Sequence, residues 1–195
     1  MRTSRLLELA AFVAFATLAG CRGSDASARY DTAGRRDSIA GVAAGAMKEE
    51  HVIGLLEWNH EADSALGALG AAHGSTLAIK DFGRMIAREH SALRRDALSM
   101  ARQLGLAPQQ PPMLPDMPPQ SLRDMVDSVA PGPGWDQAYL QLALEAHKTT
   151  MENFARALAA TKSPEVKRYI ERSAPIIQKH FDRVQRLQQT GAAAK

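Results

Sequence analysis

The chain has 195 residues, which is enough for one domain preceded by an export segment. Aromatic residues make up only 5% of it, while alanine and leucine are abundant, and this favours a helical bundle over a β-sandwich. The formal net charge is only +3, and no basic run is dense enough to bind nucleic acid, so we expect no nucleic-acid partner.

The first twenty residues have the features of an export signal. Early arginines make the start positive, and residues 9–19 form an apolar run too short to span a bilayer as a stable helix. The run ends in Leu18-Ala19-Gly20-Cys21, which resembles the lipobox of bacterial lipoproteins. The resemblance implies cleavage before Cys21, acylation of this only cysteine, and, with Arg22 next to it, location at the outer membrane facing the periplasm. The alternative is a secretory signal with an incidental cysteine.

These features divide the chain into three parts. We expect a signal peptide at 1–20, a lipidated cysteine with a polar, glycine-rich tether at 21–45, and a folded domain at 46–190. Within the domain, residues 107–134 hold eight of the ten prolines and are predicted to be largely extended. At about 3 Å per residue this segment can cross the length of a bundle. A loop at one end of the bundle is equally compatible with the sequence.

Four amphipathic stretches predict four helices, at residues 47–72, 76–104, 135–161 and 163–189. Gly74-Ser75 predicts a stop followed by a serine N-cap, and Ser163-Pro164-Glu165 is a strong helix start. Pro175 lies inside the last stretch, where it is expected to kink the helix. Glycines inside the first stretch are expected to permit close approach of a neighbouring helix.

Each predicted helix carries one histidine in the middle of its apolar stripe: His60, His90, His147 and His180. Measured from the helix breaks at Thr76 and Ser163, the four lie 14 to 17 residues away. At 1.5 Å rise per residue, this spread is only about 4.5 Å. The spacing therefore predicts that the four rings meet near the middle of the bundle.

Three patterns follow one another along the domain: Phe82, Met85 and His90; Trp135-Asp136-x-Ala138-Tyr139-Leu140 followed by His147; and Ala174-Pro175 before His180. Their order and spacing resemble the domain-of-unknown-function 4142 family over about residues 52–187. The resemblance implies a ferritin-like four-helix fold in an exported bacterial protein of the outer membrane, and it implies no activity. The sequence departs from the family pattern at Trp135, where phenylalanine is usual, and at Asp63, where we expect glutamate.

Two interpretations of the four histidines stay open. In the first, they bind a transition metal such as zinc, copper or iron, together with Asp63 or Glu57. Asp63, one turn from His60, would alternatively be the acceptor that fixes a ring tautomer. In the second, the rings form a hydrogen-bonded polar core. The protein would then be a non-catalytic structural or interaction module of the cell envelope, with an unknown protein partner.

The residues argue against an oxidase. A di-iron site needs a glutamate on two helices and Glu-x-x-His on the other two, and only Glu57-Trp58-Asn59-His60 has that form. Two facing histidines would suit haem, but no Cys-x-x-Cys-His run is present for covalent attachment. We assign no catalytic residue and favour a role that is not enzymatic. His51 and His73 lie near helix ends and are expected to be solvated.

Overall fold

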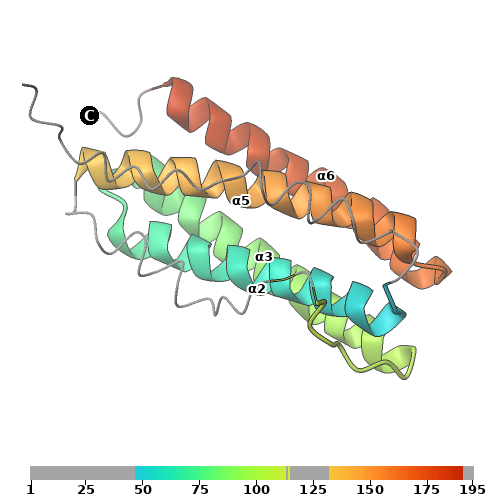
Figure 1. Cartoon of the computed structure of the whole chain (residues 1–195). Helices are drawn as coiled ribbons and strands as arrows, with labels where there is room; N and C mark the ends of the chain where they lie inside the picture. Colours follow the sequence, from blue (N-terminus) through green and yellow to red (C-terminus); the bar gives the residue numbers. More distant parts are fainter. Residues whose placement is uncertain (1–46, 113, 115–131, 191–195) are drawn as a thin grey trace, which may run out of the picture.

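The computed structural model describes residues 47–112, 114 and 132–190 (Figure 1). The predicted signal peptide, Cys21, the tether and most of the proline-rich connection lie outside these residues. Within the described ranges the chain forms four helices and no strand: α2 (Glu49–His73), α3 (Leu77–Gln103), α5 (Pro133–Ala160) and α6 (Pro164–Gln189). The predicted all-α four-helix bundle is confirmed, with boundaries within two residues of those expected. None of these helices has the length and hydropathy needed to cross a membrane.

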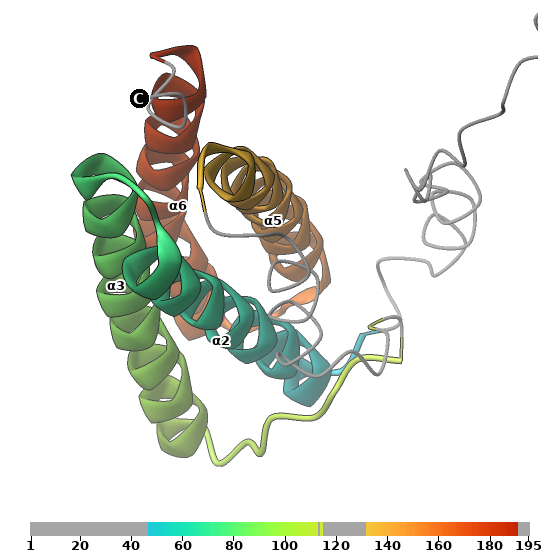
Figure 2. The same ribbon diagram turned by 90° about the vertical axis from the view of Figure 1, so that its left-hand side faces the viewer.

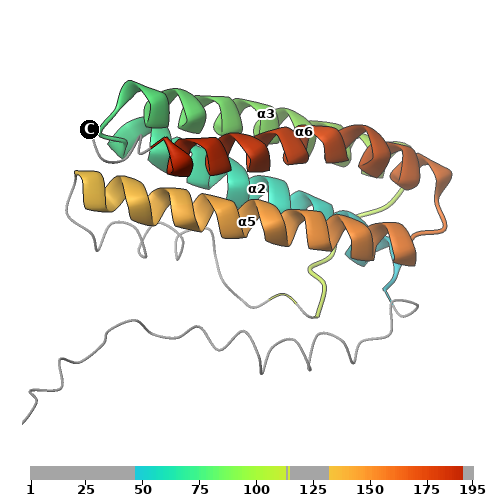
Figure 3. The same ribbon diagram turned by 90° about the horizontal axis from the view of Figure 1, so that it is seen from above.

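The helices form two antiparallel hairpins that lie side by side. α2 pairs with α3 and α5 with α6, while α5 also packs on α2 and α6 on α3 (Figures 1 and 2). α3 ends at one end of the bundle and α5 begins at the other (Figure 3). The chain between them therefore joins opposite ends, which excludes a loop confined to one end. Ferritin-like bundles have one such crossover, and that finer assignment stays a prediction.

The turn between α2 and α3 differs from the expectation in one residue. Thr76, not Ser75, is the N-cap of α3, because the Thr76 hydroxyl accepts a hydrogen bond of 3.3 Å from the backbone N–H of Ile79. Ser75 instead donates its backbone N–H and its hydroxyl to the carboxylate of Asp136, at 2.9 and 2.5 Å. The predicted serine cap was therefore wrong, and the serine ties this turn to the start of α5.

The start of α6 is as predicted. The Ser163 hydroxyl accepts from the backbone N–H of Val166 at 3.3 Å, and Pro164 occupies the first turn, where its missing N–H costs nothing. Pro175 lies inside α6 without ending it, and the helix continues from Pro164 to Gln189. The proline thus removes one internal hydrogen bond, and neighbouring turns and tertiary packing hold the helix through this point.

The buried apolar residues form two clusters, one toward each end of the bundle. The cluster at the end where α6 begins contains Val52, Leu56, Leu93, Phe154 and Ile170, among others. The opposite cluster contains Leu66, Phe82, Trp135, Leu140 and Val184, among others. The buried histidines lie between these clusters in sequence on every helix, so the polar interior is sealed by hydrophobic packing on both sides.

Small residues bring α2 and α3 unusually close together. A Cβ added to Gly67 would collide with the backbone of Ala87, and one added to Gly83 would collide with the backbone of Ala71. The expected close approach is therefore confirmed for Gly67, and Gly83 on α3 completes the contact. Because the atoms in each contact belong to the backbone, no flexible side chain can move aside to make room for a methyl group.

We predict that Gly83→Ala destabilises the folded protein by about 2 to 3 kcal/mol, because the methyl group forces the two helix backbones apart. The matched control is Gly134→Ala in the first turn of α5, where an added Cβ meets nothing within 4 Å. That change should be neutral or stabilise by up to about 1 kcal/mol. Urea unfolding of both variants measures the difference, and equal stabilities would contradict the contact.

Candidate metal centre

The four predicted histidines meet inside the bundle, and all four are fully buried. His60 Nδ1 lies 3.1 Å from His90 Nδ1, and His90 Nε2 lies 3.1 Å from His180 Nδ1. The ring of His147 lies edge-on to both His90 and His180, with centroids 5.4 Å away in each case. The helical spacing thus placed the rings correctly, because four stripes facing one axis at similar heights must converge.

Three of the rings have the arrangement of a metal site. His90, His147 and His180 each offer one nitrogen, and these nitrogens lie within 4.8 Å of one another. The 3.1 Å between His90 Nε2 and His180 Nδ1 is close to the separation of about 3.3 Å between two nitrogens that bind a tetrahedral zinc ion. His60 is not one of the three, because it lies behind His90 and faces that ring's Nδ1.

One ring nitrogen of His147 has no hydrogen-bond partner among the described residues. Its Nδ1 lies 2.7 Å from the carbonyl oxygen of Ala143 and must donate, because a carbonyl only accepts. The lone pair is therefore on Nε2, which is buried and has no hydrogen-bond partner among the described residues. An orphaned buried acceptor costs about 1 to 3 kcal/mol. A metal ion between the three rings would remove that cost.

The other two rings are also held from behind. Glu89 accepts a hydrogen bond of 2.8 Å from His180 Nε2, which leaves the lone pair of His180 on Nδ1, facing His90. Asp63 lies with Oδ2 3.5 Å from His90 Nδ1, and Thr150 donates to the same oxygen at 2.8 Å. Metal-binding histidines usually have such a carboxylate or carbonyl on the far nitrogen, which fixes the tautomer. Asp63 is thus placed behind His90 rather than among the three nitrogens, and its predicted role as a tautomer-fixing acceptor stays a prediction.

Burial keeps His60, His90 and His180 uncharged. It lowers the pKa of His60 to about 3, with a further contribution from His180. It also lowers the pKa of His180 to about 4, although the hydrogen bond to Glu89 opposes the shift, and it lowers that of His90 well below the ordinary value. Neutral imidazole is the form that binds metals, so His90 and His180 need not lose a proton near pH 7 to bind one.

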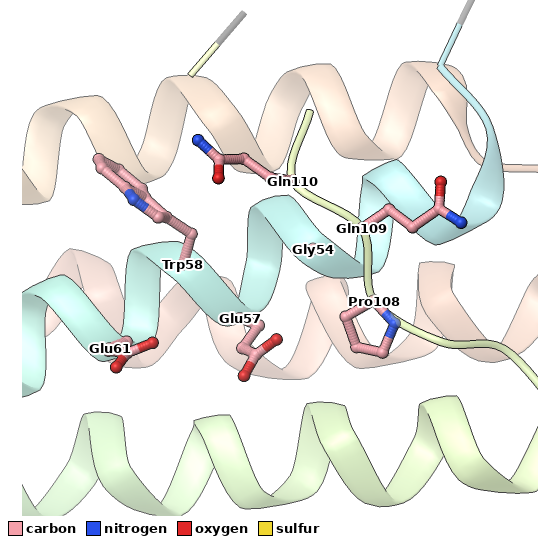
Figure 4. Close-up of a pocket in the computed structure, with 7 residues that line it drawn as sticks. All are labelled: Gly54, Glu57, Trp58, Glu61, Pro108, Gln109 and Gln110. Carbon is pink, nitrogen blue, oxygen red and sulfur yellow. The ribbon is translucent and has the colours of Figure 1, made fainter. Parts of the chain in front are cut away.

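Glu57, the remaining predicted metal residue, does not face the cluster. Its carboxylate accepts a hydrogen bond of 2.7 Å from Arg94, and both side chains are partly exposed. It lines a hollow of about 130 Å³ with Trp58, Glu61 and residues 108–110 (Figure 4). Because that hollow contains none of the histidines, it is separate from the candidate centre. His73 is exposed, as predicted, and His51 is partly buried.

Two residues of the site were missed in the sequence. Glu89 lies one position before His90 on α3. Its side chain therefore points about 100° away from that of His90 around the helix axis, toward His180 on α6. Tyr169 lies three helical turns before His180 on the same stripe, and its hydroxyl lies 2.7 Å from His60 Nε2. Position on the stripe was the available signal for Tyr169, whereas the partner of Glu89 depends on how α3 and α6 pack.

The fold and the site together define an all-helical bundle with a buried three-histidine cluster of metal-binding dimensions. Residues 36–187 match the family described as Domain of unknown function (DUF4142), and the chain belongs to this family, as the sequence predicted. No curated protein matches the chain, and no solved structure matches it.

We predict that the metal-free protein loses stability as the pH falls from about 6.5 toward 4. The buried rings have pKa values below those of the unfolded chain, so the unfolded state binds more protons in this window and gains stability. At its steepest the decline is about 1.4 kcal/mol per pH unit for each ring. Urea unfolding at several pH values measures the slope, which should be shallower in His60→Gln. A flat profile would contradict neutral burial.

Proposed function

We propose that this protein holds one divalent transition-metal ion through His90, His147 and His180, inside a bundle anchored to the cell envelope by a lipid at Cys21. The observation that carries the metal proposal is the buried lone pair of His147 Nε2, which has no partner among the described residues. It belongs to a ring that contacts both other ligands. A cation is the partner that would satisfy this nitrogen and its two neighbours together.

The charges near the cluster suit a divalent ion. Imidazole is a neutral ligand, and the carboxyl groups of Asp63 and Glu89 lie behind the rings of His90 and His180. The Glu89 carboxylate places a negative charge at the far nitrogen of His180 without contacting the metal. Burial raises the pKa of Asp63, and a divalent ion close to it would favour its charged form. Imidazole ligands favour zinc, copper or iron over magnesium or calcium. Three protein ligands leave one position of a tetrahedral ion for a further ligand.

The location rests on the sequence. The lipobox-like Leu18-Ala19-Gly20-Cys21 and the polar tether that follows it lie outside the described residues. Acylation at Cys21 would attach the bundle to the outer membrane, facing the periplasm, with membrane lipid as its first partner. No catalytic residue is assigned to the bundle.

A second function, a structural or interaction module without metal, is favoured by one observation. His60, His90, His180 and Glu89 form an unbroken row of hydrogen bonds, which satisfies most of the polar interior without an ion. In this interpretation the row specifies one packing of the four helices. The orphaned nitrogen of His147 would then be a tolerated cost.

We predict that the mature protein, treated with chelator and then dialysed against zinc, retains about one zinc per chain by elemental analysis. His147→Ala should weaken zinc binding more than about 100-fold, because it removes a ligand that acts directly. The control is His73→Ala, an exposed histidine outside the cluster, which should bind zinc normally. No zinc, copper or iron bound to the wild-type protein, and no rise in its melting temperature with any of them, would refute the proposal.

We predict that Cys21→Ser abolishes lipid labelling and releases the protein from the membrane fraction, because the acyl chains have no other thiol to occupy. Labelling with a fatty-acid analogue and membrane fractionation measure both effects. Membrane association that persists in this variant would show that the anchor lies elsewhere.

A further inference from the structure

A row of four hydrogen bonds runs through the bundle, and the metal proposal uses only part of it. Tyr169 Oη lies 2.7 Å from His60 Nε2, and His60 Nδ1 lies 3.1 Å from His90 Nδ1. His90 Nε2 lies 3.1 Å from His180 Nδ1, and His180 Nε2 lies 2.8 Å from Glu89. We call these five side chains the relay. Four of them are fully buried, and Glu89 is 25% exposed.

Without a cation, the proton positions follow from the end of the relay. The Glu89 carboxylate only accepts, so His180 carries its proton on Nε2 and has a lone pair on Nδ1. That lone pair must accept from His90 Nε2. The Nδ1 of His90 is then an acceptor, so His60 donates from Nδ1 and accepts the Tyr169 hydroxyl proton at Nε2. Every hydrogen bond points from Tyr169 toward Glu89.

A metal ion changes this pattern. Both His90 Nε2 and His180 Nδ1 must then direct lone pairs at the ion, so the proton of His90 lies on Nδ1. It is donated to His60 Nδ1, and His60 then donates from Nε2 to the oxygen of Tyr169. The Tyr169 hydroxyl has a second acceptor ready, the carbonyl oxygen of Leu93 at 3.0 Å. Each ring keeps one proton throughout.

We propose that His60 and Tyr169 are positioning residues of the metal site, which set the tautomer of His90, and that metal binding reverses the hydrogen bonds from His90 to Tyr169. This inference rests on the proposed metal site. Tyrosine suits the end of the relay because a hydroxyl both donates and accepts. Tyr169 precedes His180 by eleven residues, about 16 Å along α6. Occupancy of the centre is thus transmitted to a different part of the bundle.

A purely structural row would behave differently. If the hydrogen bonds only specify packing, their direction stays the same whether or not zinc is present. Asp63 Oδ2, 3.5 Å from His90 Nδ1, favours the reversed pattern in the metal-bound state, because a proton on that nitrogen then faces a carboxyl oxygen and not a second donor. The direction of the relay therefore distinguishes a positioning role from simple packing.

The test is nitrogen NMR of the mature protein with labelled histidines, recorded without metal and with one equivalent of zinc. We expect the proton of His60 to move from Nδ1 to Nε2 and that of His90 from Nε2 to Nδ1, while His180 keeps its proton on Nε2. Bound zinc with the His60 proton still on Nδ1 would overturn the inference and leave the metal site standing. Failure of zinc to bind would overturn both.

A pair of variants provides the second measurement. The Tyr169 hydroxyl contacts both His60 Nε2 and the carbonyl oxygen of Leu93, and its single proton cannot be donated fully to both. Only the metal-bound pattern, in which His60 donates and Leu93 accepts, satisfies both contacts, so Tyr169→Phe should weaken zinc binding about fivefold to tenfold. The control is Tyr139→Phe, since the Tyr139 hydroxyl is buried without a hydrogen-bond partner among the described residues. Equal affinities for the two variants would contradict the role of Tyr169. If Tyr169→Phe does not fold, the NMR of the unaltered protein still decides.

Discussion

The structure depends on one constraint, the burial of four imidazole rings in the middle of the bundle. Desolvation lowers the pKa values of His60, His90 and His180, so each presents one N–H and one lone pair to the interior. Inside a bundle every such group needs a partner. The positions of Tyr169 and Glu89 follow from this requirement, because they terminate the row of rings at its two ends.

Whether each buried ring nitrogen has a hydrogen-bond partner also distinguishes a packed core from a binding site. The row from Tyr169 to Glu89 is complete without any ion, so hydrogen bonding alone explains three of the histidines. His147 is the exception, because its ring is fixed by Ala143 with its free nitrogen inward. If this position served only packing, leucine or phenylalanine would avoid the free-energy cost of a buried nitrogen without a hydrogen-bond partner. The exception is what turns the polar interior into a candidate metal centre.

Much of this arrangement was predictable from the sequence, and the part that was not has a common cause. Helical periodicity depends only on spacing along one chain segment, so it located the helices and the four histidines. Glu89 is next to His90 and Glu57 is one helical turn before His60, yet Glu89 meets the cluster and Glu57 pairs with Arg94 at the surface. The rotation of each helix against its neighbours decides between these outcomes. Spacing along one helix does not contain that rotation. The turn before α3 shows the same limit, because Ser75 bonds Asp136 on α5 and leaves Thr76 as the N-cap.

The three candidate ligands are divided between the two hairpins, so a bound ion would link one hairpin to the other. α2 and α3 are held together by glycine contacts between their backbones, and α5 and α6 are joined by the short turn at Ser163. His90 belongs to the first hairpin, whereas His147 and His180 belong to the second. An ion at the three rings would therefore bridge two units whose covalent connection joins opposite ends of the bundle. Because an ion that binds only the folded state adds its binding free energy to folding, that bridge would stabilise the contact between the hairpins more than either hairpin itself.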